Sequence, residues 1–303
     1  MDTIFNRLKF ILAIYQIVAM IYNSAGTCSA QNVSAFFVFG DSMVEAGNNY
    51  HIYTLAKPAY PYEEELGFKD YSPPFLDPNT TGDVILKGVN YASAASGILN
   101  STGYIYGQHI GMSKQVDNFA KTRQEIISRI GEAAAKKLLK QAFYFILTGS
   151  NDFSMSPFSP ANYYIGSNFV DEVISQFRSQ LTMLYNLDAR KFAVTNLPAF
   201  GCTPIARDLF LSDGCVNFIN KQVQTYNTKL KSLLQELTAN LPGSTFDLKM
   251  EILLAVDCWG GMVVYMCAKP TPISVKIEAN MFSMINPIQQ ILLIYNSKED
   301  DGW

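Results

Sequence analysis

The chain has 303 residues, of which 49% are hydrophobic, enough to bury one sizeable core. A formal net charge of −3, without any Lys/Arg-rich run, argues against nucleic-acid binding. Only two histidines are present and no cysteine spacing resembles a zinc site, so we expect neither a metal nor a cofactor.

Residues 1–30 have the order of a secretory signal peptide. Two basic residues precede an apolar stretch, Phe10–Tyr22, and small residues follow it through Ala30. The alternative is a membrane anchor, but about 13 apolar residues fall short of the roughly 20 needed to span a bilayer. We therefore expect a secreted, extracellular protein that begins near Gln31 and has no integral membrane anchor.

Two further features fit an exported chain. Asn-x-Ser/Thr triplets begin at Asn32, Asn79 and Asn100, which predicts a glycoprotein. Cys202 and Cys215 lie 13 residues apart across a short polar loop, a spacing that suits a disulfide in an oxidising compartment.

Short apolar or aromatic runs alternate with longer segments of helical period, which predicts parallel strands joined by helical crossovers. The clearest helix has apolar residues every three or four positions from Ile219 to Leu241, and a second has them from Val173 to Leu184. We predict an α/β fold, a three-layer α/β/α sandwich with a central parallel sheet and active residues at the carboxyl ends of the strands. The strand candidates are Ala35–Phe39, Val89–Ala92, Phe143–Leu147, Phe192–Leu197 and Thr245–Leu248.

Candidate site residues follow three of these strands. Ser42 ends a Gly-Asp-Ser turn, where the start of a following helix can add backbone N–H groups that stabilise negative charge. The alternative is that Asp and Ser form an ordinary helix cap after a strand, which would have the same sequence pattern. Gly97 lies in a run of small residues that lets backbone N–H groups approach a ligand. Asn151 can direct an amide N–H toward an oxyanion, or can be a simple turn residue.

The sequence blocks around these residues are similar to those of the plant GDSL esterase/lipases, members of the SGNH hydrolase family. The similarity runs from about Phe36 to about Val256, within a hydrolase domain that we place at residues 31–256. The resemblance implies a flavodoxin-like sandwich that hydrolyses a small ester or acyl substrate, acts in lipid degradation and is a monomer. It also implies that Ser42 is the nucleophile and that Gly97 and Asn151, with the Ser42 N–H, form the oxyanion hole. The blocks are Phe37-Val38-Phe39-Gly40-Asp41-Ser42, Gly47-Asn48-Asn49, Gly88–Ile98, Gly149-Ser150-Asn151-Asp152, Gly201-Cys202-Thr203-Pro204 and Gly214-Cys215-Val216.

Two departures from the family pattern bear on activity. The segment Tyr60-Pro61-Tyr62 directly adjoins Glu63–Gly67, so the stretch of family sequence that forms a wall near the nucleophile is missing. Residues 257–303 form an aberrant C-terminal segment that lacks the family's catalytic Asp-x-x-His, and no histidine occurs beyond His109. Prolines interrupt this segment, so we expect it to pack poorly.

Read in a shifted frame, the codons of Cys267–Ile291 can encode an ending with Asp-x-x-His-Pro, which indicates a frameshift or a mis-spliced exon. We interpret His51 and His109 as solvated or structural residues, because a general base needs a partner that orients it. The chain is therefore predicted to be a secreted serine ester hydrolase by family that is inactive as written. The alternative is a non-catalytic secreted protein that binds a ligand in the same cleft.

Overall fold

The computed structural model of the chain describes residues 34–57, 72–154 and 168–248, together with the backbone of three strands between 251 and 274. Contacts divide the chain after Val33, and all that follows concerns the unit that begins at Ser34. The predicted signal peptide, residues 1–30, and the triplet at Asn32 lie outside the described residues, as does most of the segment 257–303.

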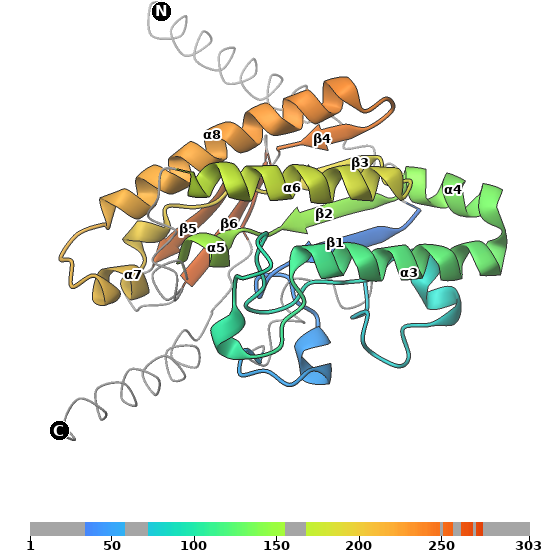
Figure 1. Ribbon diagram of the computed structural model, residues 1–303, viewed down its shortest axis with the longest axis horizontal. Helices are drawn as coiled ribbons and strands as arrows, with labels where there is room; N and C mark the ends of the chain where they lie inside the picture. The colour runs from blue at the N-terminus through green and yellow to red at the C-terminus, as the bar shows by residue number, and fades with distance from the viewer. Residues whose placement is uncertain are drawn as a thin grey trace, which may run out of the picture. The chain divides into compact units, whose positions relative to one another are not determined.

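A four-stranded parallel sheet forms the centre of the fold, with the strand order β1-β2-β3-β4 (Figure 1). The register pairs Phe36 with Phe143, Phe143 with Lys191, and Lys191 with Thr245. This arrangement of parallel strands with flanking helices confirms the predicted α/β fold class. The strands are β1 (Phe36–Gly40), β2 (Phe143–Leu147), β3 (Lys191–Val194) and β4 (Thr245–Asp247).

The predicted strand Val89–Ala92 is reduced to a single parallel bridge between Val38 and Asn90. The Val38 N–H donates to Val89 O at 3.1 Å, and the Tyr91 N–H donates to Val38 O at 2.8 Å. On its other side the segment pairs only at Pro74, where consecutive prolines supply no N–H groups. The segment therefore lies beside β1 without continuing as a regular fifth strand.

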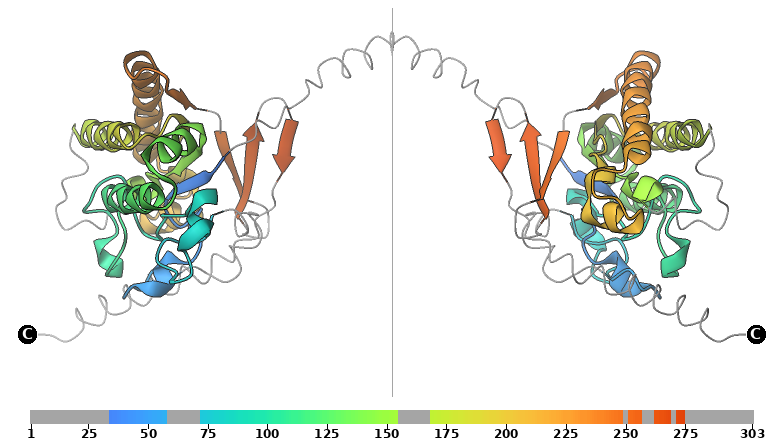
Figure 2. Two further views of the ribbon diagram at one scale, coloured as in Figure 1. Left: turned by 90° about the vertical axis from the view of Figure 1, so that its right-hand side faces the viewer. Right: turned by 90° about the vertical axis from the view of Figure 1, so that its left-hand side faces the viewer.

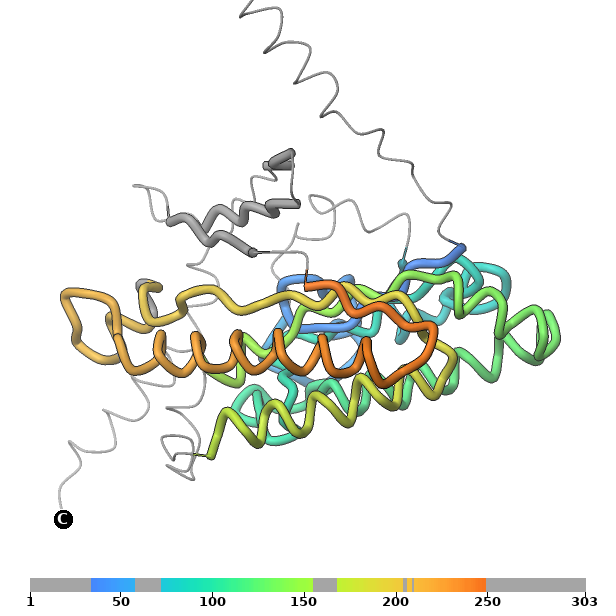
Figure 3. Tube along the Cα trace, turned by 90° about the horizontal axis from the view of Figure 1, so that it is seen from above, coloured from blue at the N-terminus to red at the C-terminus, as the bar shows by residue number. Residues whose placement is uncertain are grey.

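Long helices cross over between successive strands, and α6 contacts both α3 and α8. In the tube view, α6 and α8 run side by side along the sheet (Figure 3). The α-helices are α3 (Met112–Ile130), α4 (Glu132–Gln141), α5 (Ser150–Ser154), α6 (Phe169–Asn186), α7 (Pro204–Leu209) and α8 (Asn217–Asn240). Short 3-10 helices complete the described part: η1 (Asn48–His51), η2 (Gly82–Lys87), η3 (Tyr104–Tyr106) and η6 (Phe200–Cys202).

Figure 2 shows the ribbon of the helices beside the central sheet. The hydrophobic core lies between these helices and one face of the sheet. Phe37 of β1 and Tyr144 of β2 stack at 5.3 Å between ring centroids, and Phe119 of α3 meets both rings edge-on. The apolar stripes predicted for the two helices are confirmed as core. The buried residues of these stripes are Val173, Phe177, Leu181 and Leu184 on α6, and Ile219, Val223, Tyr226, Leu230, Leu233 and Leu237 on α8.

Beyond β4 the backbone forms a second sheet of three antiparallel strands, β5 (Glu251–Val256), β6 (Met262–Ala268) and β7 (Thr271–Ser274). Sequence analysis predicted no strand here, although the run of valine, methionine and tyrosine in β6 suits one. Pro272 pairs with Cys267 in β7, an edge strand of this sheet, where a missing N–H is tolerated.

Candidate active site

The carboxyl end of β1 leads into a tight turn that carries Ser42. Gly40 has a φ of 156°, and a Cβ atom placed on it would lie 2.1 Å from Leu147 O. Only glycine therefore lets the ends of β1 and β2 approach so closely. The Asp41 N–H then donates to Leu147 O at 3.1 Å, and Ser42 follows, half-buried, at the carboxyl edge of the sheet.

Asp41 joins this turn to α5. Its carboxylate is fully buried and accepts hydrogen bonds from the Met43 N–H at 3.1 Å and from Ser150 Oγ. Burial raises the pKa of Asp41 to about 6, the hydrogen bonds from Ser150 and Met43 oppose the rise, and the nearby Asp152 carboxylate adds to it. The turn that carries Ser42 and the first residue of α5 are thus fixed to one another.

The raised pKa of Asp41 makes stability pH-dependent. Between about pH 4 and pH 6 folded Asp41 keeps a proton that the unfolded chain has released, so its contribution favours folding at low pH and is lost as pH rises. We expect the Asp41→Asn variant to lack this decline, which is on the order of 2–3 kcal/mol. Urea unfolding at pH 4, 5, 6 and 7 measures it, with Asp117→Asn as the exposed control. Equal slopes in the wild type and Asp41→Asn would contradict the assignment.

The loop that carries Gly97 is held by Asp152. The Asp152 carboxylate accepts from the Ile98 N–H at 2.8 Å, the Leu99 N–H at 3.0 Å and Thr102 Oγ1 at 2.7 Å. A Cβ atom on Gly97 would lie 2.5 Å from Asp152 Oδ2, so the contact requires glycine. Burial raises the pKa of Asp152, although these hydrogen bonds to the carboxylate lower it.

Asn151 ties α5 to the same loop. Its side-chain Nδ2 donates to Ser96 O at 2.8 Å, and Ser96 Oγ donates to Gly40 O at 2.9 Å. Hydrogen bonds therefore link the three segments that carry Ser42, Gly97 and Asn151 at one edge of the sheet. Sequence analysis expected these segments to converge here.

Two buried asparagines hydrogen-bond to the segment that leads toward Gly97. The sequence alone assigned them no role. Asn48 Nδ2 donates to Asn90 O and to Ala92 O, both at 2.9 Å. Asn49 Oδ1 accepts from Ser93 Oγ at 2.7 Å, and its Nδ2 donates to Ala94 O at 3.2 Å. These bonds satisfy backbone groups that no regular strand pairs. The Gly47-Asn48-Asn49 block was the available signal.

Gln115 of α3 is a further support that the sequence did not reveal. It is fully buried, its Oε1 accepts from the Gly40 N–H at 2.9 Å, and its Nε2 donates to Gly40 O at 2.8 Å. The same Nε2 donates to Ile110 O at 2.7 Å. Gln115 thus fixes both polar backbone groups of the residue that precedes the Asp41–Ser42 turn.

The hydroxyl of Ser42 and the N–H groups of Ser42 and Gly97 take no part in this hydrogen-bond network. Among the hydrogen bonds of residues 34–57, 72–154 and 168–248, none is donated by Ser42 Oγ, the Ser42 N–H or the Gly97 N–H. Asn151 Nδ2 carries two hydrogens and donates to one acceptor among the described residues, Ser96 O, so one hydrogen is available. An edge with a hydroxyl and unpaired donors can receive a polar group of a ligand.

Neither histidine completes a catalytic triad within the described residues. His51 is exposed at the end of η1, and His109 Nδ1 lies 3.2 Å from Gly107 O. Neither ring makes a hydrogen bond or ion pair with a carboxylate in the described part of the chain. Both therefore lack the partner that would orient a general base.

No group of three or more His, Cys, Asp or Glu side chains that could hold a metal ion occurs in the part of the chain that the structure describes. None of the described helices has both the length and the apolar character needed to cross a membrane.

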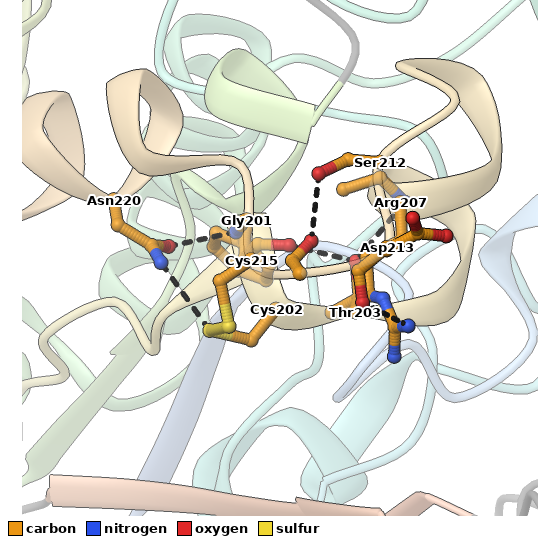
Figure 4. The surroundings of a disulfide bond; sticks show 11 residues. Gly201, Cys202, Thr203, Arg207, Ser212, Asp213, Cys215 and Asn220 are labelled. Carbon is orange, nitrogen blue, oxygen red and sulfur yellow. Dashed lines mark hydrogen bonds between the residues drawn. A yellow bond between two sulfur atoms is a disulfide. The ribbon is translucent and has the colours of Figure 1, made fainter.

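The predicted disulfide between Cys202 and Cys215 is confirmed and closes the loop that contains α7 (Figure 4). Asn220 of α8 secures the start of this loop, because its Nδ2 donates to Cys202 Sγ at 3.3 Å and its Oδ1 accepts from the Gly201 N–H at 2.8 Å. Closing a loop of this size is worth about 3 kcal/mol on the chain-entropy model. The bond also fixes η6, which contacts α5.

The parallel sheet carries the Ser42 turn, the Gly97 loop and the start of α5 at its carboxyl edge, an arrangement that fits an α/β hydrolase. The GDSL-like lipase/acylhydrolase family matches residues 36–251, and the chain belongs to this family of carboxylic ester hydrolases. A GDSL esterase/lipase of Arabidopsis thaliana is 41% identical over 260 residues, which cover 76% of this chain and 71% of that protein. A second is 36% identical over 270 residues, covering 75% and 70%. GDSL esterase/lipase 7 from the same plant is 37% identical over 243 residues, covering 70% and 67%.

Proposed function

We propose that the carboxyl edge of this sheet is a site for hydrolysis of carboxylic esters, with Ser42 as the nucleophile. Ser42 Oγ would attack the ester carbonyl, release the alcohol and form an acyl-enzyme, which water then hydrolyses. The N–H groups of Ser42 and Gly97 and the Asn151 amide would hold the oxyanion. The observation that carries the proposal is that the Ser42 and Gly97 N–H groups and one hydrogen of the Asn151 amide have no acceptor among the described residues, on segments tied together by hydrogen bonds.

We also propose that the chain as written is disarmed. A neutral serine hydroxyl needs a base to take its proton during attack, and neither His51 nor His109 has an orienting carboxylate among the described residues. Removal of the triad histidine from a serine protease costs about a millionfold in turnover, while the oxyanion hole and binding retain about a thousandfold over water. Ser42 would accordingly contribute little to the rate.

The cellular setting and partners belong to the same proposal. Export is supported by the basic, apolar and small order of residues 1–30, and glycosylation by the Asn-x-Ser/Thr triplets. A disulfide between Cys202 and Cys215 is typical of an oxidising compartment. The substrate would be a small ester or acyl compound, such as one released in lipid degradation, bound by a monomer.

A second candidate function is ligand binding without turnover. The chain keeps the hydrogen-bond network around Asp41, Asp152 and Gln115. Its C-terminal segment, however, lacks the Asp-x-x-His motif that supplies the catalytic base in the family. This combination favours binding without turnover. Under this function the edge would hold an ester or acyl group by its donors alone.

Two measurements, of ester hydrolysis and of ligand binding, distinguish the two functions and test the disarmed state. We expect the chain as written to hydrolyse p-nitrophenyl acetate barely above background, and Ser42→Ala to change the rate less than about twofold, because no base activates the hydroxyl. Retained binding of a non-hydrolysable ester analogue would then support the second function. Ser42-dependent hydrolysis at ordinary enzyme rates would contradict disarming and direct attention to His51.

A further inference from the structure

An open pocket of about 520 Å³ lies apart from the residues of the proposed ester site. None of Ser42, Gly97 and Asn151 lines it. Its walls come from the segment after η1, from the loop that precedes α3 and from α3 itself. This volume lies within the range of roughly 300–1,000 Å³ that is common for small-molecule sites.

One wall is a short two-stranded ladder. Thr54 and Gly107 form an antiparallel bridge, the Leu55 N–H donates to Tyr106 O at 2.8 Å, and the Gln108 N–H donates to Tyr53 O at 3.0 Å. These bonds hold the backbone around the pocket residues Gly107 and Gln108 in place before any ligand arrives.

Another part of the lining presents apolar side chains from a segment that backbone hydrogen bonds also hold in place. The Phe75 N–H donates to Asn90 O at 2.9 Å, and the Leu76 N–H donates to Asn48 Oδ1 at 2.9 Å. Phe75 and Leu76 line the pocket with Ile52 and Ile110. A hydrocarbon chain can therefore be buried against preformed apolar surface.

The α3 side of the pocket is polar and cationic. Asn118 is only 4% exposed; its Oδ1 accepts from Lys121 Nζ at 3.4 Å, and its Nδ2 donates to no described residue. Lys114 and Lys121 make no ion pair with any described residue, and the pocket lining contains no acidic side chain. Asp117 lies between them in sequence but outside the lining. An unpaired amide donor on a largely buried side chain, with cations nearby, suits a carboxylate.

We propose that this pocket binds an amphipathic carboxylate. The carboxylate accepts from Asn118 Nδ2 and lies near Lys114 and Lys121, while the hydrocarbon chain packs against Phe75 and Leu76. The inference concerns binding alone and does not rest on the proposed hydrolysis, because the pocket holds none of the residues assigned to that reaction.

The test is calorimetric titration of the full chain with sodium octanoate, compared with octan-1-ol, which has the same number of carbon atoms and no charge. We expect saturable octanoate binding, and weaker binding of octan-1-ol. The double variant Lys114→Glu/Lys121→Glu should weaken octanoate binding about fivefold or more, because exposed charges each contribute up to about 1 kcal/mol. Lys137→Glu/Lys140→Glu on α4 makes the same charge change far from the lining and should leave binding unchanged.

Two further variants probe each end of the pocket. Asn118→Asp keeps the size of the side chain and the contact with Lys121, but places a negative charge where the carboxylate should lie, so octanoate binding should be lost. Leu76→Ser should weaken octanoate and octan-1-ol alike. The proposal is overturned if octanoate does not saturate, if octan-1-ol binds equally well, or if both lysine pairs weaken binding to the same extent.

Discussion

Rebuilding the C-terminal segment should raise ester hydrolysis by on the order of 10³-fold or more, and the increase should depend on Ser42. The rebuilt chain replaces residues 257–303 with the shifted-frame ending and restores the family segment after Tyr62. The reason is chemical: the ending supplies an Asp-x-x-His pair, and a histidine within reach converts the Ser42 hydroxyl into a competent nucleophile. Initial rates with p-nitrophenyl acetate measure the effect.

The carboxyl edge of the sheet has polar side chains that a restored C-terminal segment could hydrogen-bond. The side-chain oxygens Thr148 Oγ1, Thr195 Oγ1 and Asn196 Oδ1 are buried and have no hydrogen-bond partner in the described part of the chain. All three follow the carboxyl ends of β2 and β3. Buried polar atoms without partners are costly, so a segment that packs here and satisfies them should also stabilise the fold.

Two controls isolate the chemistry of the rebuilt chain. Ser42→Ala in the rebuilt background should return the rate to that of the chain as written, and so should replacement of the restored histidine by alanine. A rebuilt chain that folds, as judged by a cooperative thermal transition, yet stays at background would show that Ser42 is not the nucleophile. Equal rates with and without Ser42 would lead to the same conclusion.

The sequence predicted the parts of the fold that depend on periodicity. Apolar runs located β1 to β4 to within a few residues, and the stripes of α6 and α8 are core. The helix α3 escaped prediction because its buried face includes Gln115, Asn118 and Thr122, so it lacks a clean apolar stripe. Gln115 is buried because it bonds the backbone of Gly40 and Ile110, whereas Thr122 Oγ1 donates to Asn118 O within the helix.

The sequence predicted where the candidate site lies but not the contacts that hold it in place. Ser42 and Asn151 follow strands that the sequence reveals, so their place at the carboxyl edge could be inferred. The supports of that edge could not, since Gln115 and Gly40 are 75 residues apart and Ser150 and Asp41 are 109 apart. Such contacts depend on three-dimensional packing, and no local spacing records them.

Asp152→Ala should be the most destabilising point substitution at the candidate site, lowering the free energy of unfolding by about 3–5 kcal/mol. The change removes the acceptor of three donors at once, the N–H groups of Ile98 and Leu99 and the hydroxyl of Thr102. Each buried donor left without a partner costs about 1–3 kcal/mol. The cost is partly offset because a buried carboxylate with a raised pKa is itself unfavourable in its charged form.

Urea unfolding at pH 7, with Asp208→Ala on α7 as the exposed control, measures the loss at Asp152. Asp208→Ala should change stability by less than about 0.5 kcal/mol, as surface substitutions usually do. Asp152→Asn keeps one acceptor oxygen and should lie between the wild type and Asp152→Ala. If Asp152→Ala were as mild as the control, the carboxylate would not be what holds the Gly97 loop, and the close approach at Gly97 would need another explanation.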